Sequence, residues 1–139
     1  MGHRISLLLV LQLGAGLFGS VAFGHALEPG YLEIREIDQT LYAVVWKKPA
    51  VAGAPMPIAA RLPASCDPRA AEELSWDGTA YYARWTATCA DGISGGEITI
   101  AGLGQTSTDV LVRILFVDGT TRTQRLTPTR TSFVIAAQP

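Results

Sequence analysis

The chain has 139 residues with 11 basic and 12 acidic side chains, so its formal net charge is -1. This balance gives no electrostatic basis for binding a nucleic acid, which requires a clustered basic surface. Hydrophobic residues make up 48% of the chain and charged residues only 17%, which excludes a disordered polyelectrolyte. We therefore expect one folded domain that binds no nucleic acid.

The first segment has the layout of a secretion signal. His3 and Arg4 form a short basic start, and residues 5–23 form an apolar run without any charge. Small residues at Gly24 and Ala26 then follow in the spacing that signal peptidase recognises. The order of these three parts predicts export from the cytoplasm.

We place the cleavage after Ala26, which gives a signal peptide over residues 1–26 and an exported, periplasmic domain over residues 27–139. Cleavage after Gly24 is the second choice. The remaining alternative is an uncleaved N-terminal membrane anchor, because an apolar run of this length is just sufficient to span a bilayer.

Apolar and polar residues alternate in eight short runs of the exported part, and turn residues separate these runs. Asp-Gly pairs at residues 77–78, 91–92 and 118–119 favour tight turns because glycine tolerates positive φ. The pattern predicts an all-β, antiparallel, immunoglobulin-like sandwich of about seven or eight strands, with an open barrel as the alternative. One helical turn is conceivable over residues 69–74. The predicted strands are residues 31–37, 41–46, 58–62, 80–88, 97–101, 109–117, 122–126 and 132–135.

Cys66 and Cys89 are the only cysteines, and both lie in the exported part. An even number of cysteines in an oxidising compartment predicts a disulfide. The bridge would close a loop of about 24 residues and stabilise the fold by about 3 kcal/mol in the chain-entropy model. A reactive or metal-binding thiol pair is disfavoured because the spacing is not C-x-x-C and no histidine lies nearby.

Histidine is nearly missing from the exported part. His3 leaves with the signal peptide and His25 lies at the cleavage boundary, so the folded part lacks the commonest general base and metal ligand. We therefore expect no enzyme of the Ser-His-Asp kind, no catalytic residue and no cofactor. His25 is a metal candidate only if cleavage after Gly24 makes it the N-terminus, where it could chelate copper or nickel. No glycine-rich phosphate loop leads from a strand into a helix, so nucleotide binding is not expected.

Other side chains give weaker signals. Glu72 with Glu73, and Glu33 with Glu36, are expected on solvated surface rather than as a glycosidase pair. Four arginines near residues 118–119 are expected to be solubilising unless the strand register gathers them on one face. Seven Trp and Tyr residues are expected in the core and at its edges, with a carbohydrate-binding face as the alternative. These residues are Arg113, Arg122, Arg125 and Arg130, and Trp46, Trp76, Trp85, Tyr31, Tyr42, Tyr81 and Tyr82.

Several segments of the exported part form a recognisable family pattern. They are residues 25–33 directly after the signal, Trp46, residues 57–66, Cys89 ahead of the glycines at 95–96, residues 100–113 and residues 124–128. This pattern resembles the extracytoplasmic β domain that precedes the membrane helices in HupE/UreJ-like bacterial membrane proteins. The resemblance covers essentially all of the exported part.

In that family, the helical part is linked with nickel or cobalt uptake for hydrogenase and urease. The present chain stops at Pro139 without that part, so no metal-transport residue is carried over to it. The resemblance implies a non-enzymatic exported accessory or interaction domain whose partner is a membrane protein. A periplasmic metal- or ligand-binding protein is the alternative.

Overall fold

The computed structural model describes residues 28–137, so the predicted signal peptide, both cleavage positions and His25 lie outside the described residues. The described part is all-β and contains one three-residue 3-10 turn, η1 (Leu103–Gln105). Its strands are β1 (Gly30–Glu36), β2 (Leu41–Lys48), β3 (Ala50–Val51), β4 (Ala54–Pro55), β5 (Ala59–Arg61), β6 (Cys66–Asp67), β7 (Ser75–Trp76), β8 (Tyr81–Cys89), β9 (Glu97–Ala101), β10 (Val110–Leu115), β11 (Thr121–Leu126) and β12 (Ser132–Val134).

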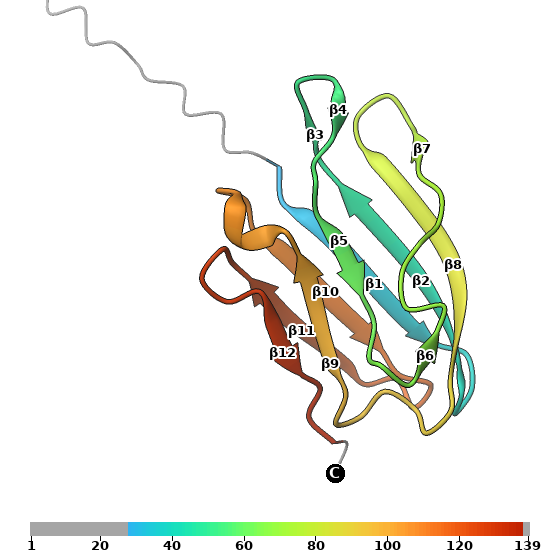
Figure 1. Ribbon diagram of the computed structural model, residues 1–139. Coiled ribbons are helices and arrows are strands. Elements are labelled where there is room, and N and C mark those ends of the chain that lie inside the picture. The colour runs from blue at the N-terminus through green and yellow to red at the C-terminus, as the bar shows by residue number, and fades with distance from the viewer. Residues whose placement is uncertain (1–27, 138–139) are drawn as a thin grey trace, which may run out of the picture.

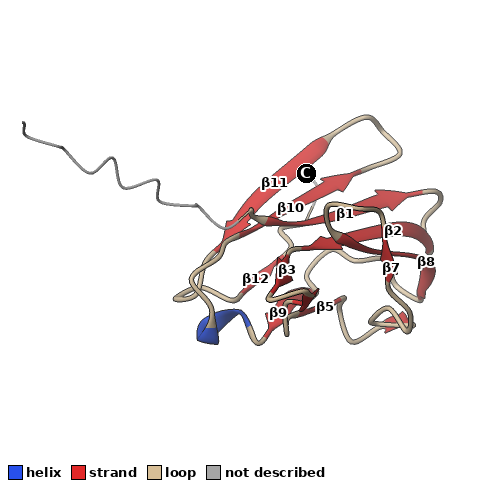
Figure 2. Ribbon diagram, turned by 90° about the horizontal axis from the view of Figure 1, so that it is seen from above, coloured by secondary structure: helices blue, strands red, loops and turns tan. Residues whose placement is uncertain are grey.

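Two sheets make up the body of the fold (Figure 1). The larger sheet has the order β11-β10-β1-β2-β8-β6, with β7 also paired to β8, and the smaller has the order β12-β9-β5. Figure 2 shows the two sheets as separate layers when the molecule is seen from above. The short strands β3 and β4 pair only with each other and form a hairpin.

The core lies between the two layers because alternate residues of both sheets point inward. Burial alternates along β1 and β2 up to their last residues, and β9 and β10 show the same period of two. The inward positions of these four strands are mainly apolar, so the two sheets bury them against each other. The fully buried side chains contributed by these four strands include Leu32, Ile34, Val44, Trp46, Ile98, Ile100, Val110, Val112 and Ile114.

All eight predicted strand segments correspond to strands, with ends displaced by at most two residues. The strands β3, β4, β6 and β7 were not predicted, because two residues are too few to show an alternating pattern. The helical turn considered over residues 69–74 is wrong, since none of these residues is helical.

The expectation of a purely antiparallel sheet is wrong for one pair of strands. β1 pairs in parallel with β10, and Gly30 lies opposite Val110 while Arg35 lies opposite Leu115. Alternation along a strand identifies its buried face but carries no information on the direction of a partner that is distant in sequence. β1 therefore lies inside the large sheet, between β10 and β2.

Candidate functional site

The outward face of the large sheet carries half-exposed side chains that alternate with the core residues. The strand register places Tyr31 of β1 between Leu111 of β10 and Lys47 of β2. Tyr82 of β8 lies opposite Lys47 and continues the same row. Residues from β10, β1, β2 and β8 thus form one transverse row on this face, although β8 and β10 are distant from β1 and β2 in sequence.

A shallow, open depression lies over this row and has a volume of about 580 Å³. Its lining is mostly apolar and includes Tyr31, Val45, Tyr82 and Leu111. Lys47 also lines the depression, and its ammonium lies 3.8 Å from the carboxylate of Glu28. An apolar floor with a few polar groups can bind an apolar or aromatic segment of another molecule.

A hydrogen-bonded cluster next to the depression fixes one of its aromatic residues. The Tyr31 hydroxyl donates to Oε2 of Glu33 at 2.7 Å, and Arg35 donates to Oε1 of Glu33 at 3.2 Å. The bond from Tyr31 lowers the pKa of Glu33, and Arg35 contributes further. Burial, followed by the same hydrogen bond, raises the pKa of Tyr31. Glu33 is therefore a carboxylate at neutral pH and is not poised to act as a proton donor.

The carboxylates considered as pairs have different surroundings in the structure. Glu33 accepts hydrogen bonds from Tyr31 and Arg35. Glu36 has a different partner, because it accepts a hydrogen bond from the backbone N–H of Val117 at 2.9 Å. Glu72 and Glu73 are exposed and border a second depression, of about 290 Å³, next to Trp85.

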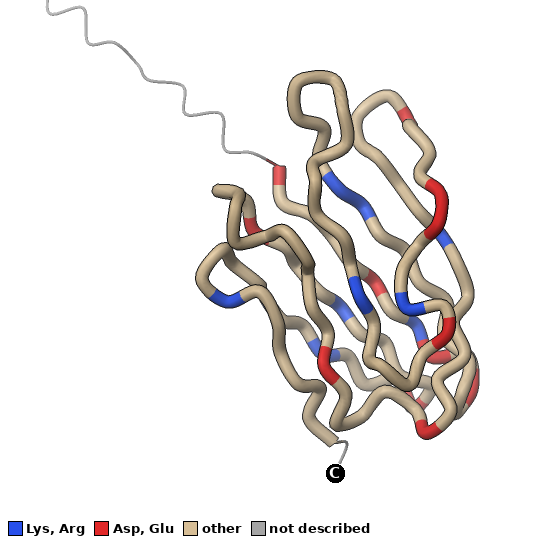
Figure 3. Tube along the Cα trace, in the orientation of Figure 1, with Lys and Arg blue, Asp and Glu red and all other residues tan. Residues whose placement is uncertain are grey.

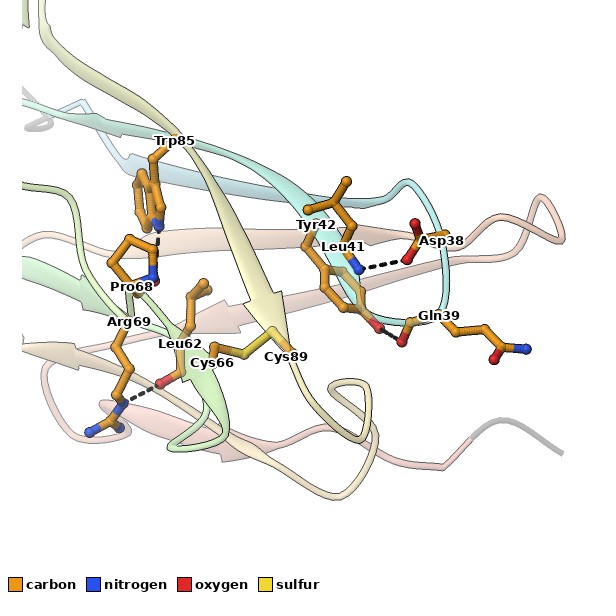
Figure 4. The surroundings of a disulfide bond; sticks show 10 residues. All are labelled: Asp38, Gln39, Leu41, Tyr42, Leu62, Cys66, Pro68, Arg69, Trp85 and Cys89. Carbon is orange, nitrogen blue, oxygen red and sulfur yellow. Dashed lines mark hydrogen bonds between the residues drawn. A yellow bond between two sulfur atoms is a disulfide. The ribbon is translucent and has the colours of Figure 1, made fainter.

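The aromatic residues are divided between the core and the surface. Tyr42 and Trp46 are buried in the core, and Trp85 packs against it from the edge. The indole N–H of Trp85 donates to the carbonyl of Pro68 at 3.1 Å, as Figure 4 shows. Trp76 lies in the short strand β7 at the edge of the large sheet, where the residue is 52% exposed. Exposure of this tryptophan has no signal in the sequence, since β7 itself was not predicted.

The four arginines do not gather on one face. The register places Arg113 and Arg125 on the outward side of the large sheet, whereas Arg122 lies opposite Ile114 and belongs to the inward side. Arg130 is exposed in the turn before β12. Arg125 forms an ion pair with Asp109.

The Cys66–Cys89 disulfide is confirmed (Figure 4). The two cysteines lie directly opposite each other in the antiparallel pair of β6 and β8, with a Cα–Cα distance of 4.0 Å. Both are buried in the core cluster. The bridge therefore fastens the short edge strand β6 to the large sheet and has a structural position.

Within residues 28–137, no group of three His, Cys, Asp or Glu side chains is arranged to hold a metal ion. The same part of the chain has no helix that is long and apolar enough to cross a membrane. No protein-family model matches the sequence, and a search of curated proteins finds no match.

Proposed function

We propose that the protein is a non-enzymatic, exported interaction domain that binds an extracytoplasmic segment of a membrane protein. In this proposal residues 1–26 are a signal peptide, and residues 27–139 form an immunoglobulin-like sandwich similar to the β domain of HupE/UreJ-like proteins. The all-β fold, its two layers and the buried disulfide support the proposal, because disulfides persist in oxidising, extracytoplasmic compartments.

The observation that carries the proposal is the open depression formed by Tyr31, Val45, Tyr82 and Leu111. Its floor comes from the regular strands β1, β2, β8 and β10, so its shape is set mainly by the sheet, and Glu28 and Pro29 border it just before β1. It offers an aromatic and aliphatic floor, and its lining residues include no serine, threonine, cysteine or histidine. These features suit the recognition of a side chain and do not suit the transformation of a substrate.

The proposed occupant is an extended or looped segment that presents an apolar or aromatic side chain. Tyrosines are favoured at protein interfaces because they bury a large area at a small cost in conformational entropy. Lys47 and Glu28 at the border of the depression would add polar contacts of both signs. Such a border contributes more to the choice of partner than to affinity.

A photo-crosslinking amino acid at Tyr82, installed in the full chain in its native host, tests this function. We expect an adduct in the membrane fraction whose mass-spectrometric peptides identify a protein with several membrane helices. The matched control carries the same amino acid at Ser94, an exposed position between β8 and β9, and should give no such adduct. Adducts with soluble proteins only, or equal adducts from both positions, would contradict the proposal.

A further inference from the structure

One end of the sandwich is apolar and exposed. Residues 49–57 contain no charged side chain and no side chain that can donate a hydrogen bond. They include the β3–β4 hairpin, in which Val51 is 42% exposed and Ala52, Gly53 and Ala54 are also exposed. Figure 3 shows this hairpin at the top of the molecule without any charged position.

A second hairpin extends this surface. Trp76 in β7 is 52% exposed, and its ring centroid lies 4.8 Å from that of Tyr81 in β8. The hydroxyl of Tyr81 donates to the carbonyl of Gly53 at 3.2 Å. This bond joins the two hairpins, and we refer to Val51, Ala52, Gly53, Trp76 and Tyr81 as the apolar tip.

The turn of the β3–β4 hairpin places an apolar residue in a strained backbone conformation. Ala52 has φ +50° and is the only non-glycine residue with positive φ among those described, and Gly53 follows with φ +77°. A two-residue turn with two positive φ angles strongly prefers asparagine, aspartate or glycine at its first position. Alanine lacks a polar side chain and is unfavourable in the left-handed region. Strain that persists at an exposed position points to a function of that position.

The charged side chains around the apolar tip are two of each sign, and each of them has a polar partner. The Lys48 ammonium donates to the carbonyl of Ile58 at 2.8 Å, and Lys47 lies near Glu28. The Asp77 carboxylate accepts three hydrogen bonds within its own turn, from Thr79 and Ala80, which lower its pKa. Attachment of the tip to another surface must therefore rest mainly on apolar contact.

The position of the tip also relates it to the start of the described chain. Glu28 lies at the same end of the sandwich, because it pairs with Lys47 and its carbonyl accepts a hydrogen bond from Thr108. The uncharged apolar run over residues 5–23 precedes Glu28 by only a few residues in the sequence. Until the predicted signal peptide is cleaved, the apolar tip therefore lies at the end of the sandwich that adjoins this run in the sequence.

We propose that the apolar tip inserts shallowly into the interfacial region of a lipid bilayer. Trp76 and Tyr81 combine an apolar ring with one polar atom, which suits the headgroup level of a membrane. Val51 and Ala52 would lie at the boundary with the acyl chains. A lipid surface is favoured over a protein partner because residues 49–57 carry no side-chain donor and the Tyr81 hydroxyl is already bonded to Gly53. The indole N–H of Trp76 suits the headgroup level of a membrane.

Vesicle binding of the protein purified after export of the full chain tests the proposal. Vesicles of phosphatidylcholine, with or without phosphatidylglycerol, should shift the emission of Trp76 to shorter wavelength, and brominated acyl chains should quench it. The contribution of Trp76 is obtained by subtracting the spectrum of the Trp76→Phe variant, because Trp46 is buried and Trp85 is packed against the core. This readout remains valid if the N-terminal run is retained and anchors the chain by itself.

Two aspartate variants provide a matched comparison. Val51→Asp should weaken the partitioning roughly tenfold, since that corresponds to the loss of a buried valine side chain. Val117 is 68% exposed. It follows β10, which runs parallel to β1 and away from the tip. Val117→Asp should therefore leave the partitioning into vesicles unchanged. Thermal unfolding checks that both variants are folded. Trp76→Ser provides a second tip variant, whose binding is measured by co-sedimentation with vesicles because it lacks the fluorescent reporter. No quenching of Trp76, or an equal loss in both aspartate variants, would overturn the proposal.

Discussion

Among single residues, Tyr31 couples the depression on the large sheet to the ionisation of Glu33. Its hydroxyl is the main cause of the lowered pKa of Glu33, and it also lines the depression. In Tyr31→Phe we expect the pKa of Glu33 to rise toward its ordinary value because this donor is removed. A carboxyl-detected NMR titration of Glu33 in both proteins measures the change.

The sign of the resulting pH dependence follows from the direction of this shift. A carboxyl group with a lowered folded-state pKa stabilises the fold above its unfolded pKa, and this stability is lost as pH falls through the folded value. The decrease in the free energy of unfolding on acidification should therefore be smaller in Tyr31→Phe when unfolding is measured from neutral pH downward. An unchanged Glu33 titration in the variant would show that Tyr31 does not control this carboxyl group.

A glycine at the start of η1 is required for two separate reasons. Gly102 has φ +81°, and a side chain there would collide with the carbonyl oxygen of Pro57. We expect Gly102→Ala to lower the free energy of unfolding by about 2 kcal/mol or more, from backbone strain plus steric displacement.

Gly119 provides the matched control for this prediction. It has φ +86°, and an added Cβ would meet nothing within 4 Å. Gly119→Ala should therefore show the strain alone, about 1 kcal/mol, in the same denaturant titration. Equal losses in the two variants would mean that the contact with Pro57 is readily relieved.

Among the elements, the β3–β4 hairpin should become more stable when its turn residue is changed. Ala52→Asn removes the penalty for a left-handed alanine, because asparagine tolerates positive φ. The amide of Met56 donates to the carbonyl of Pro49 at the base of this hairpin. Its hydrogen exchange should slow by up to about fivefold in Ala52→Asn, equivalent to about 1 kcal/mol. Faster exchange in the variant would contradict the assignment of strain to Ala52.

The sequence predicts the positions of the strands better than it predicts which strands pair with one another. Alternation was sufficient to locate every strand longer than two residues, because burial of one face leaves a period of two. It could not place Tyr31 beside both Leu111 and Lys47, since that depends on the parallel pairing of β1 with β10. The depression and the apolar tip combine residues whose proximity is created by pairing, so neither could be predicted from local pattern.

Some local signals did carry information on register. Asp38 accepts hydrogen bonds from the backbone amides of Thr40 and Leu41, which closes the turn between β1 and β2. Asp77 makes the equivalent bonds to Thr79 and Ala80 before β8. Aspartate at such positions is a typical turn former because its short carboxylate reaches nearby amides.

For the whole molecule, the disulfide should provide a large part of the stability. Replacement of both Cys66 and Cys89 by alanine should lower the free energy of unfolding by about 2–4 kcal/mol. The loss arises because the loop of 23 residues of separation is no longer closed in the unfolded chain. Denaturant unfolding of the oxidised protein and the double variant measures it, and a loss below about 1 kcal/mol would contradict the expected magnitude.

A folded domain with this core is expected to need no metal ion. The described residues contain no cluster of metal ligands, so a chelator and added nickel should leave the melting temperature unchanged. Binding at a hundredfold excess over Kd would stabilise the native state by about 2.7 kcal/mol, which thermal unfolding would detect. A rise of several degrees with nickel would favour the metal-binding alternative, and the His25→Ala variant would then locate the ion.

The central position of β1 has a consequence for the order in which the protein acquires its structure. β1 is the first strand of the described chain, yet its partner β10 lies about eighty residues later. A chain that emerges from its N-terminus can pair β1 with β2 at once, but one edge of β1 stays open until β10 has been made. Contacts between distant segments slow folding, and unpaired strand edges invite aggregation. One edge of β1 therefore stays unpaired, and open to association with other chains, until the last third of the described chain is available to fold.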